Sequence, residues 1–384
     1  MVPVRYNLRS LLVRKVTTGA TAVGIALVVF VFAAALMLGE GIDRALATAG
    51  RPDNVIILRK GSDSELASAI GNDYVNLFGA QPQVSQAGGV IGEIIIVVTA
   101  ERSDDSGVSN VLVRGTPPTG IAFRPEIKIV RGRMPKPGTN EAIVGKAIAG
   151  RFKGITIDDS FDLRHNRPLQ IVGEFSADGS SYESEVWGDL DTVRRALGRD
   201  AVVSSARVRL NSPSDFDAYR GLIEGDKSVS MKVQREADYY DKQSQATSGF
   251  LKGMGIGIAV LFSLAAMLGA AITMNGAIAH RSREIGTLRA LGFSRFSILL
   301  SFLFEAIVLS VIGGVIGSAF VLLLSFVTFP VMNFQTFSEI VISFHATPAV
   351  FVKALVFSGV MGLLGGLVPA IRASRVSPIE AMRA

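Results

Sequence analysis

Four long apolar runs constrain the fold of this 384-residue chain more than any other feature of its sequence. The runs cover residues 19–38, 251–279, 297–327 and 349–368. An α-helix rises about 1.5 Å per residue, so about 20 apolar residues are enough to cross the hydrocarbon core of a bilayer. We therefore predict a membrane protein with four transmembrane α-helices.

The first run also has features of a secretory signal peptide, because four basic residues and no acidic residue precede it. Its 20 uncharged residues are too many for the apolar region of such a peptide, and no clear small-x-small cleavage site precedes Glu40. We therefore predict that the run is retained as a membrane anchor, preceded by a cytoplasmic segment at 1–18.

Residues 39–250, between the first two runs, have the composition of a water-exposed domain. Short β-rich segments recur in it and are punctuated by Gly, Pro, Asn and Asp, which indicates strands and turns. The predicted strands cover 54–58, 91–99, 111–114, 127–130, 169–175 and 207–210, and the predicted helices cover 64–78, 140–152, 190–197 and 214–224. Because the segment is long enough for a sizeable core, we predict a large α+β domain between the first and second transmembrane helices.

A polar helical pattern at 232–252 runs directly into the second apolar run. One helix covering both segments would extend well beyond the membrane as a stalk. Small residues also recur every four positions in the apolar runs, at Gly253/Gly257, Ala265/Gly269, Ala266/Ala270, Gly313/Gly317 and Gly362/Gly366. Such spacing lets helices approach closely in lipid, either within one chain or between two copies.

The distribution of charge predicts the orientation of the chain. Residues 39–250 hold 26 Lys and Arg against 29 Asp and Glu, whereas the rest of the chain holds 13 against 4. The N-terminal segment, the loop at 280–296 and the tail at 369–384 together carry 11 Lys and Arg, and the loop at 328–348 carries none. Because basic loops stay in the cytoplasm, we predict an inner-membrane protein with both ends inside and the large domain in the periplasm. The basic excess then suits lipid headgroups rather than nucleic acid.

The sequence lacks the common catalytic and cofactor-binding patterns. It has no cysteine, and its three histidines (His165, His280 and His345) are far apart, so no thiol or metal site is expected. Residues 138–147 contain glycines and a lysine, but with the wrong spacing for a phosphate-binding loop and without its Ser or Thr. We predict a non-catalytic subunit without a cofactor. An enzyme with its active site in the outer domain is the least favoured alternative.

The loop at 280–296 has the most distinctive local pattern in the chain. It carries four arginines, Arg281, Arg283, Arg289 and Arg295. Three apolar residues recur at intervals of three, Ile285, Leu288 and Leu291, and this spacing predicts a short helix over 283–291 with one apolar face. Gly292 suits the end of that helix and Ser294 the N-cap of the next. An amphipathic helix at a membrane surface is predicted, although many ordinary loops share this pattern.

This loop and the run after it resemble the C-terminal permease domain of the FtsX/MacB family of ABC transporters. The family pattern has Arg-x-Arg-Glu-Ile-Gly, then Arg-Ala-Leu-Gly, then a spanning helix with an early Glu-Ala and a later Gly-Gly. The matching residues here are Arg281, Arg283, Glu284, Ile285, Gly286, Leu288, Arg289, Ala290, Leu291, Gly292, Glu305, Ala306, Gly313 and Gly314. The closing residues 368–384 also resemble the C-terminus of that family.

The resemblance implies a partner and a function. In the family, the basic segment is a coupling helix that docks on an ATPase, so ATP and Mg²⁺ would be bound by a separate ATPase subunit. The residues expected to contact it are Arg281, Arg283, Glu284, Ile285, Thr287, Leu288, Arg289, Leu291 and Gly292. We expect a permease that converts ATP hydrolysis into movement outside the membrane and drives export of a hydrophobic, peptide or lipid-like substrate. A second copy or a paralogous permease, and a periplasmic adaptor protein, are further expected partners.

A second function is compatible with the same resemblance. An FtsX-like protein passes the motion of its ATPase to a cell-wall hydrolase outside the membrane. The outer domain of about 210 residues is large for that role, which favours the transporter.

Glu305 is the one acidic residue inside an apolar run. An ionisable group within the membrane is costly, and it usually faces the helix bundle or has a partner. Asn275 and the basic loop are the partners within plausible reach. We predict that Glu305 and Asn275 pass movement of the coupling helix into the bundle, and a purely structural hydrogen bond is the alternative.

The outer domain resembles, more loosely, the periplasmic core domain of MacB-like permeases. The similar segments are 127–133, 141–145 and 171–173. The resemblance implies a central subdomain inserted into a split one whose halves adjoin the first and second spanning helices. Trp187 is compatible with a ligand contact, but a position in the core or at the subdomain joint is the favoured interpretation.

Overall fold

The computed structural model describes residues 15–47, 50–86, 89–226 and 228–377. The chain divides into two compact units. The membrane unit comprises Met1–Glu40, Phe250–Val327 and Ser343–Ala384, and the outer unit comprises Gly41–Gly249 and Thr328–Ile342. Most of the basic residues predicted to hold the two ends of the chain in the cytoplasm, Arg5, Arg9, Arg14 and Arg383, lie outside the described residues.

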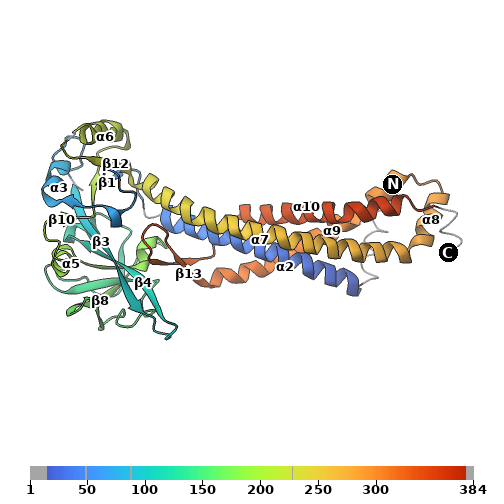
Figure 1. Ribbon diagram of the computed structural model, residues 1–384, viewed down its shortest axis with the longest axis horizontal. Coiled ribbons are helices and arrows are strands. Elements are labelled where there is room, and N and C mark those ends of the chain that lie inside the picture. The colour runs from blue at the N-terminus through green and yellow to red at the C-terminus, as the bar shows by residue number, and fades with distance from the viewer. Residues whose placement is uncertain (1–14, 48–49, 87–88, 227, 378–384) are drawn as a thin grey trace. The chain divides into compact units, whose positions relative to one another are not determined.

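Four helices are long and apolar enough to cross a membrane, as the sequence predicts (Figure 1). They are α2 (Lys15–Ala47), α7 (Glu236–His280), α9 (Arg295–Val321) and α10 (Pro348–Ser374). A 3₁₀ turn, η4 (Leu322–Phe326), continues α9. The 45 residues of α7 form one unbroken helix of about 68 Å, so a single helix covers the polar and the apolar segment, as predicted; its extension beyond the membrane as a stalk stays a prediction.

Two of the predicted small-residue pairs pack within the chain. A side chain at Gly313 or Gly317 of α9 would collide with the backbone of α2. Gly362 and Gly366 of α10 lie equally close to α9. By contrast, a side chain at Gly257 of α7 would meet no atom within 4 Å. The apolar part of α7 is also the least buried of the four helices, since only 11% of its 18-residue apolar stretch is buried in this chain.

The outer unit is built on one large sheet with helices packed on it (Figure 1). Its strands are β1 (Asn54–Arg59), β3 (Val90–Glu101), β4 (Val108–Thr116), β5 (Lys128–Gly132), β6 (Glu141–Gly145), β7 (Ser160–Arg164), β8 (Arg167–Ser176), β9 (Glu185–Asp189), β11 (Ser205–Arg209) and β12 (Met231–Arg235). The order across the sheet is β12-β1-β11-β3-β4-β9-β6-β8-β5, with β7 paired to β8. Smaller elements are β2 (Ile70–Gly71), β10 (Val202–Val203), α3 (Asn72–Gly79), α4 (Pro118–Ala122), α5 (Leu190–Leu197), α6 (Phe216–Gly225) and the 3₁₀ turns η1 (Glu65–Ala67), η2 (Ser181–Ser184) and η3 (Pro213–Asp215).

The sheet carries two hydrophobic cores, and strand β3 takes part in both. The start of β3 pairs with β11, and the rest of β3 pairs with β4. One core joins β1, β11 and β12 to α3 and α6, while the other joins β4, β6, β8 and β9 to α5. Among the strands of the first core, β1 comes from the beginning of the outer segment Gly41–Gly249, and β11 and β12 come from its end. The expected central subdomain, inserted into a split one, is therefore present.

Two predicted helices of the outer domain are wrong. Residues 64–78 instead form η1, β2 and the shorter helix α3, because the backbone at Gly71 is extended and α3 begins only after it. Residues 140–152 contain strand β6, whose apolar centre is fully buried between β8 and β9. Here sheet pairing overrides the local helical pattern. The helices predicted at 190–197 and 214–224 are confirmed as α5 and as η3 with α6.

The loop predicted at 328–348 is a β-hairpin made of β13 (Thr328–Met332) and β14 (Glu339–Ser343). It packs on the outer unit rather than standing free. The N–H of Val341 donates to the Ser184 hydroxyl at 2.9 Å. The buried carboxylate of Glu339 lies between the guanidinium groups of Arg102, at 2.8 Å, and Arg151, at 3.3 Å. In the sequence, the only signal of this contact is the single acidic residue Glu339 at the end of an uncharged stretch.

Candidate functional site

The segment predicted to be a coupling helix folds as helix α8 (Ser282–Ala290) between α7 and α9. Gly292 follows it with a φ of 93°, a left-handed conformation that residues with a side chain rarely adopt. The Ser294 hydroxyl accepts a hydrogen bond from the N–H of Ser297 and so caps α9. The predicted helix, its glycine end and the serine cap are therefore confirmed.

The prediction that three apolar residues form one outward face of α8 is wrong. Ile285 is only 2% exposed and packs on Ile278 and Phe302 inside the membrane unit. Leu288 is partly buried against the same cluster, whereas Leu291 is 72% exposed. Helix α8 ends at Ala290. Leu291 therefore lies outside the helix and does not continue the side of α8 that faces the membrane unit, although it follows Leu288 by three positions. Ile285 therefore packs α8 onto the membrane unit, and Leu291 is the residue of the three whose side chain is exposed.

The nine residues expected to contact an ATPase divide by exposure. Five are exposed: Arg283, Glu284, Thr287, Leu291 and Gly292. Leu288 and Arg289 are partly buried, and Arg281 and Ile285 are buried. Arg289 donates a hydrogen bond to the backbone oxygen of Phe293 at 3.0 Å, which fixes the turn after α8. The surface that a partner can reach is therefore polar, with Leu291 at one end.

Arg281 joins α8 to the membrane helices through a buried ion pair. Its guanidinium lies 3.3 Å from the Glu305 carboxylate of α9 and 3.1 Å from Glu284. It also lies over the ring of Phe302 at 5.4 Å, a cation–π distance. Glu305 thus pairs with the basic loop, one of its two predicted partners. The part predicted for Asn275 stays a prediction.

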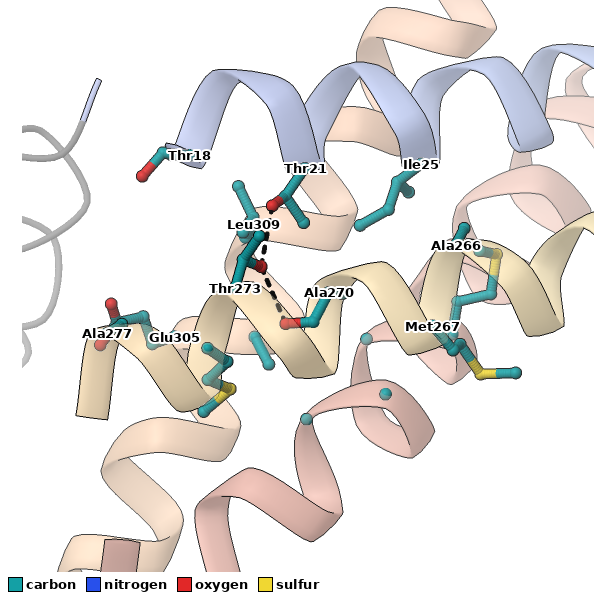
Figure 2. A pocket seen from close by; sticks show the side chains of 16 residues that line it. Thr18, Thr21, Ile25, Ala266, Met267, Ala270, Thr273, Ala277, Glu305 and Leu309 are labelled. Carbon is teal, nitrogen blue, oxygen red and sulfur yellow. Dashed lines mark hydrogen bonds between the residues drawn. The ribbon is translucent and has the colours of Figure 1, made fainter. Parts of the chain in front are cut away.

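A cavity of about 70 Å³ lies next to Glu305 between the four membrane helices (Figure 2). The Thr21 and Thr273 hydroxyls meet at 3.1 Å along its wall and join α2 to α7. Alanine and glycine residues of α7, α9 and α10 line much of the rest. Small-molecule sites typically enclose more than about 300 Å³, so this space is too small for a drug-sized ligand. It leaves room for small shifts of the helices beside the Arg281–Glu305 pair.

The outer unit contains a second cluster of buried charge that the sequence analysis missed. Three arginines and four glutamates, all buried, form one network: Arg114, Arg124, Arg207, Glu65, Glu93, Glu185 and Glu236. The sequence contains one signal that could have revealed this network: a charged residue stands within a β-rich segment at Glu93, Arg114 and Arg207. A charge at such a position is buried only when it is paired.

Glu93 lies at the centre of this network. The Arg124 guanidinium binds both of its carboxylate oxygens, at 2.9 and 2.8 Å. Arg114 approaches it at 3.1 Å, and Arg207 donates to it in a short contact. Because Glu93 and Arg207 belong to the split subdomain while Arg114 and Arg124 belong to the inserted one, the network holds the two subdomains together.

The network also fixes the first turn of α7. The Glu236 carboxylate accepts hydrogen bonds from Arg207 at 2.8 Å and from Asn54 at 2.8 Å. The Tyr240 hydroxyl, one turn further along the helix, accepts a hydrogen bond from Arg207 at 3.0 Å. Trp187 lies on the same cluster, 1% exposed, and its indole N–H donates to Glu185 at 2.8 Å. The core position favoured for this tryptophan is therefore confirmed.

The network makes the stability of the outer unit sensitive to acid. Burial opposes ionisation of Glu65, but the nearby Arg207 and Arg114 outweigh it and lower its pKa from 4.5 to about 2. The pKa of Glu93 is lowered further by its three arginines, again against the effect of burial. A carboxyl group with a lowered folded-state pKa stabilises the protein above its unfolded pKa, and this contribution is lost as the pH falls toward the folded value.

We expect the free energy of unfolding of the outer unit to fall between about pH 5 and about pH 2, by a few kcal/mol from Glu65 and Glu93. Trp187 is the only tryptophan of the chain, so urea unfolding followed by its fluorescence reports on this unit. Glu65→Gln should reduce the pH dependence, whereas Glu101→Gln, a matched change at the exposed Lys153–Glu101 pair, should reduce it less. A stability that stays flat over this range would contradict the paired network.

No group of three or more His, Cys, Asp or Glu suited to a metal ion occurs among the described residues.

Two family profiles match this chain and together cover most of it. The profile described as "MacB-like periplasmic core domain" matches residues 18–225, and the one described as "FtsX-like permease C-terminal" matches residues 256–378. The first of these covers more than half of the chain.

Similar known proteins include two exporters. The pyoverdine export ATP-binding/permease protein PvdT of Pseudomonas putida is 27% identical over 408 residues, covering 97% of this chain and 58% of that protein. The macrolide export ATP-binding/permease protein MacB of Neisseria gonorrhoeae is 25% identical over 230 residues, covering 57% of this chain and 34% of that protein. The crystal structure of the periplasmic region of MacB from Actinobacillus actinomycetemcomitans covers 50% of this chain and 92% of its own, with 12% identity and a TM-score of 0.37. This chain therefore spans less than two thirds of the length of either exporter.

Proposed function

The chain belongs to the FtsX/MacB-type permease family, and from this premise we propose that it works as the membrane subunit of an exporter driven by a separate ABC ATPase. It is an ABC transporter permease by family, and its 384 residues contain no phosphate-binding loop. The ATPase partner would bind ATP and Mg²⁺, and this chain would convert the closure of the ATPase into movement of its outer unit. We propose a hydrophobic, peptide or lipid-like substrate; the similar exporters are named for macrolides and for pyoverdine.

The observation that carries the proposal is the way α8 is attached. Its inner side is fixed to the membrane helices by buried Ile285 and by the Arg281–Glu305 pair. Its other side presents Leu291 and polar residues to solvent. A force on the exposed side of α8 would therefore be transmitted directly to α9, because the buried ion pair and the close-packed side chains allow little relative movement between the two helices. The unbroken helix α7 then offers a rigid connection from α8 to the Glu236 end of the stalk.

The proposed orientation follows the positive-inside rule. The chain would lie in the inner membrane with α8 in the cytoplasm and the outer unit in the periplasm. A second copy, or a paralogous permease, would pack along α7, whose apolar surface is mostly uncovered in the single chain. A periplasmic adaptor would complete an export path.

We expect the full chain to co-purify with an ABC ATPase and to change the ATPase rate of that partner in lipid nanodiscs. A complex that stimulates transport of an added substrate supports the exporter. A complex that instead activates an added cell-wall hydrolase supports the alternative FtsX-like role. Failure to bind any ABC ATPase encoded in the same genome would overturn the proposed function as a whole.

A further inference from the structure

The β-hairpin formed by β13 and β14 exposes apolar side chains that no contact inside the outer unit explains. Phe329 is 48% exposed, Met332 51% and Phe337 58%. We call these three residues the hairpin patch. Single exposed apolar residues are ordinary on protein surfaces, but several on one short hairpin indicate an interaction surface.

Several groups of the hairpin are bound to the rest of the outer unit. Glu339 is bound by Arg102 and Arg151, and the N–H of Val341 donates to Ser184. The side-chain amide of Asn110 donates to the backbone oxygen of Phe337 at 2.9 Å. These contacts hold the hairpin on the outer unit. Phe329 and Met332 are three positions apart in β13, so their exposed side chains lie on opposite faces of the strand.

Phe337 itself has an unusual backbone. Its φ is 54°, in the left-handed region where glycine or asparagine is usual and a bulky residue is rare. Its N–H donates to the oxygen of Asn333 at 2.8 Å, so the turn is held in this form. The hairpin thus keeps a phenylalanine where a glycine would be less strained, which indicates that the exposed ring itself has a role.

The sequence around the patch has the character of a membrane segment. No Asp, Glu, Lys, Arg or His occurs from Ala306 to Ser338, so the uncharged stretch continues well past the end of α9 at Val321. Phe329 follows the last residue of η4, Phe326, by three positions. Three residues reach at most about 10 Å, so the covalent chain keeps the start of the hairpin close to the end of an apolar helix.

We propose that the hairpin patch inserts into the headgroup–acyl boundary of the outer leaflet of the bilayer. The patch offers aromatic and thioether side chains without charge, which suits this boundary. A protein partner for such a surface usually also needs a polar rim with hydrogen-bonding groups. The bilayer surface would then hold the outer unit through the hairpin, in addition to its covalent links to α2 and α7. This inference depends on membrane insertion of the chain and not on the identity of its ATPase or substrate.

Spin labels on single cysteines test this proposal in the full chain, which has no cysteine of its own. The variants are Phe329→Cys, Met332→Cys and Phe337→Cys, reconstituted in phosphatidylcholine nanodiscs. Leu222→Cys is the matched control, because Leu222 is an apolar residue, 50% exposed, of helix α6, which packs on the first core of the outer unit. Accessibility of each label to oxygen and to a water-soluble nickel complex is measured.

The proposal predicts an oxygen-to-nickel accessibility ratio several-fold higher at the three patch positions than at Leu222. Ratios equal to that of Leu222 would place the patch in water and overturn the proposal. Immobile labels that neither reagent reaches would also overturn it, since they would show a protein surface, such as a second copy of the chain, covering the patch. Agreement among the three positions guards against a local disturbance at any one of them.

Discussion

Arg207→Met should remove about 3–5 kcal/mol from the free energy of unfolding of the outer unit. Arg207 is fully buried and binds Glu65, Glu93 and Glu236, so its loss leaves three buried carboxylates short of one cation. Neither water nor another side chain can take its place without rebuilding the network. Urea unfolding of the full chain in detergent, followed by Trp187 fluorescence, measures the change.

Arg220→Met is the matched control for this prediction. Arg220 pairs with Glu224 along one helix and is about half exposed, so its loss should cost under about 1 kcal/mol. Equal effects of the two substitutions would show that the buried network contributes no more than a surface pair. The network would then have no special part in holding the stalk to the sheet.

Arg281→Met should destabilise the membrane unit and abolish the effect of the permease on its ATPase. The change removes the cation that pairs with the Glu305 carboxyl group inside a helix bundle, and breaking a buried pair in this way typically costs about 3–5 kcal/mol. The double variant Arg281→Met/Glu305→Leu removes both charges and should recover most of that stability. Thermal unfolding in detergent and ATPase rates in nanodiscs are the two measurements.

The double variant separates the two interpretations of Glu305. If the pair transmits motion, the double variant is stable but remains uncoupled. If it is only a structural contact, the double variant regains both stability and coupling. Arg372→Met serves as control, because Arg372 is exposed on α10, is not among the residues expected to contact the ATPase, and its loss should leave both quantities nearly unchanged.

Much of the architecture could be predicted because it depends on long, regular patterns. Apolar runs of membrane length identified the four helices that are long enough to span a membrane, and turn residues located six of the ten strands of the large sheet. The glycine and serine that bound α8 and α9 were recognised for the same reason, since Gly292 and Ser294 have local roles. Local signals of this kind need no knowledge of tertiary contacts.

The errors arose where tertiary contacts decide the outcome. The spacing of Ile285, Leu288 and Leu291 is helical, but which side of a short helix faces its own bundle depends on Phe302 and its neighbours, more than ten residues away. The pairing of Arg114 with Glu185 joins residues 71 positions apart. The segment at 141–145 became a strand because partners elsewhere in the chain, β8 and β9, were available to pair with it.

The corrected face of α8 also changes the most direct test of the proposed function. Leu288→Asp would disturb the fold, because Leu288 packs on the cluster around Ile285. Leu291 is exposed, so Leu291→Asp changes the surface offered to a partner without opening the core. Burying a leucine is worth about 1.5–3 kcal/mol, which corresponds to at least about a tenfold change in affinity.

The deciding measurement is the Kd between the full chain in nanodiscs and its ABC ATPase, with Leu222→Asp of the outer unit as the matched exposed control. The account predicts that Leu291→Asp weakens binding at least about tenfold, and that Leu222→Asp leaves the Kd unchanged. Unaltered binding and ATPase stimulation with Leu291→Asp would contradict the claim that α8 is the surface through which the ATPase drives this permease.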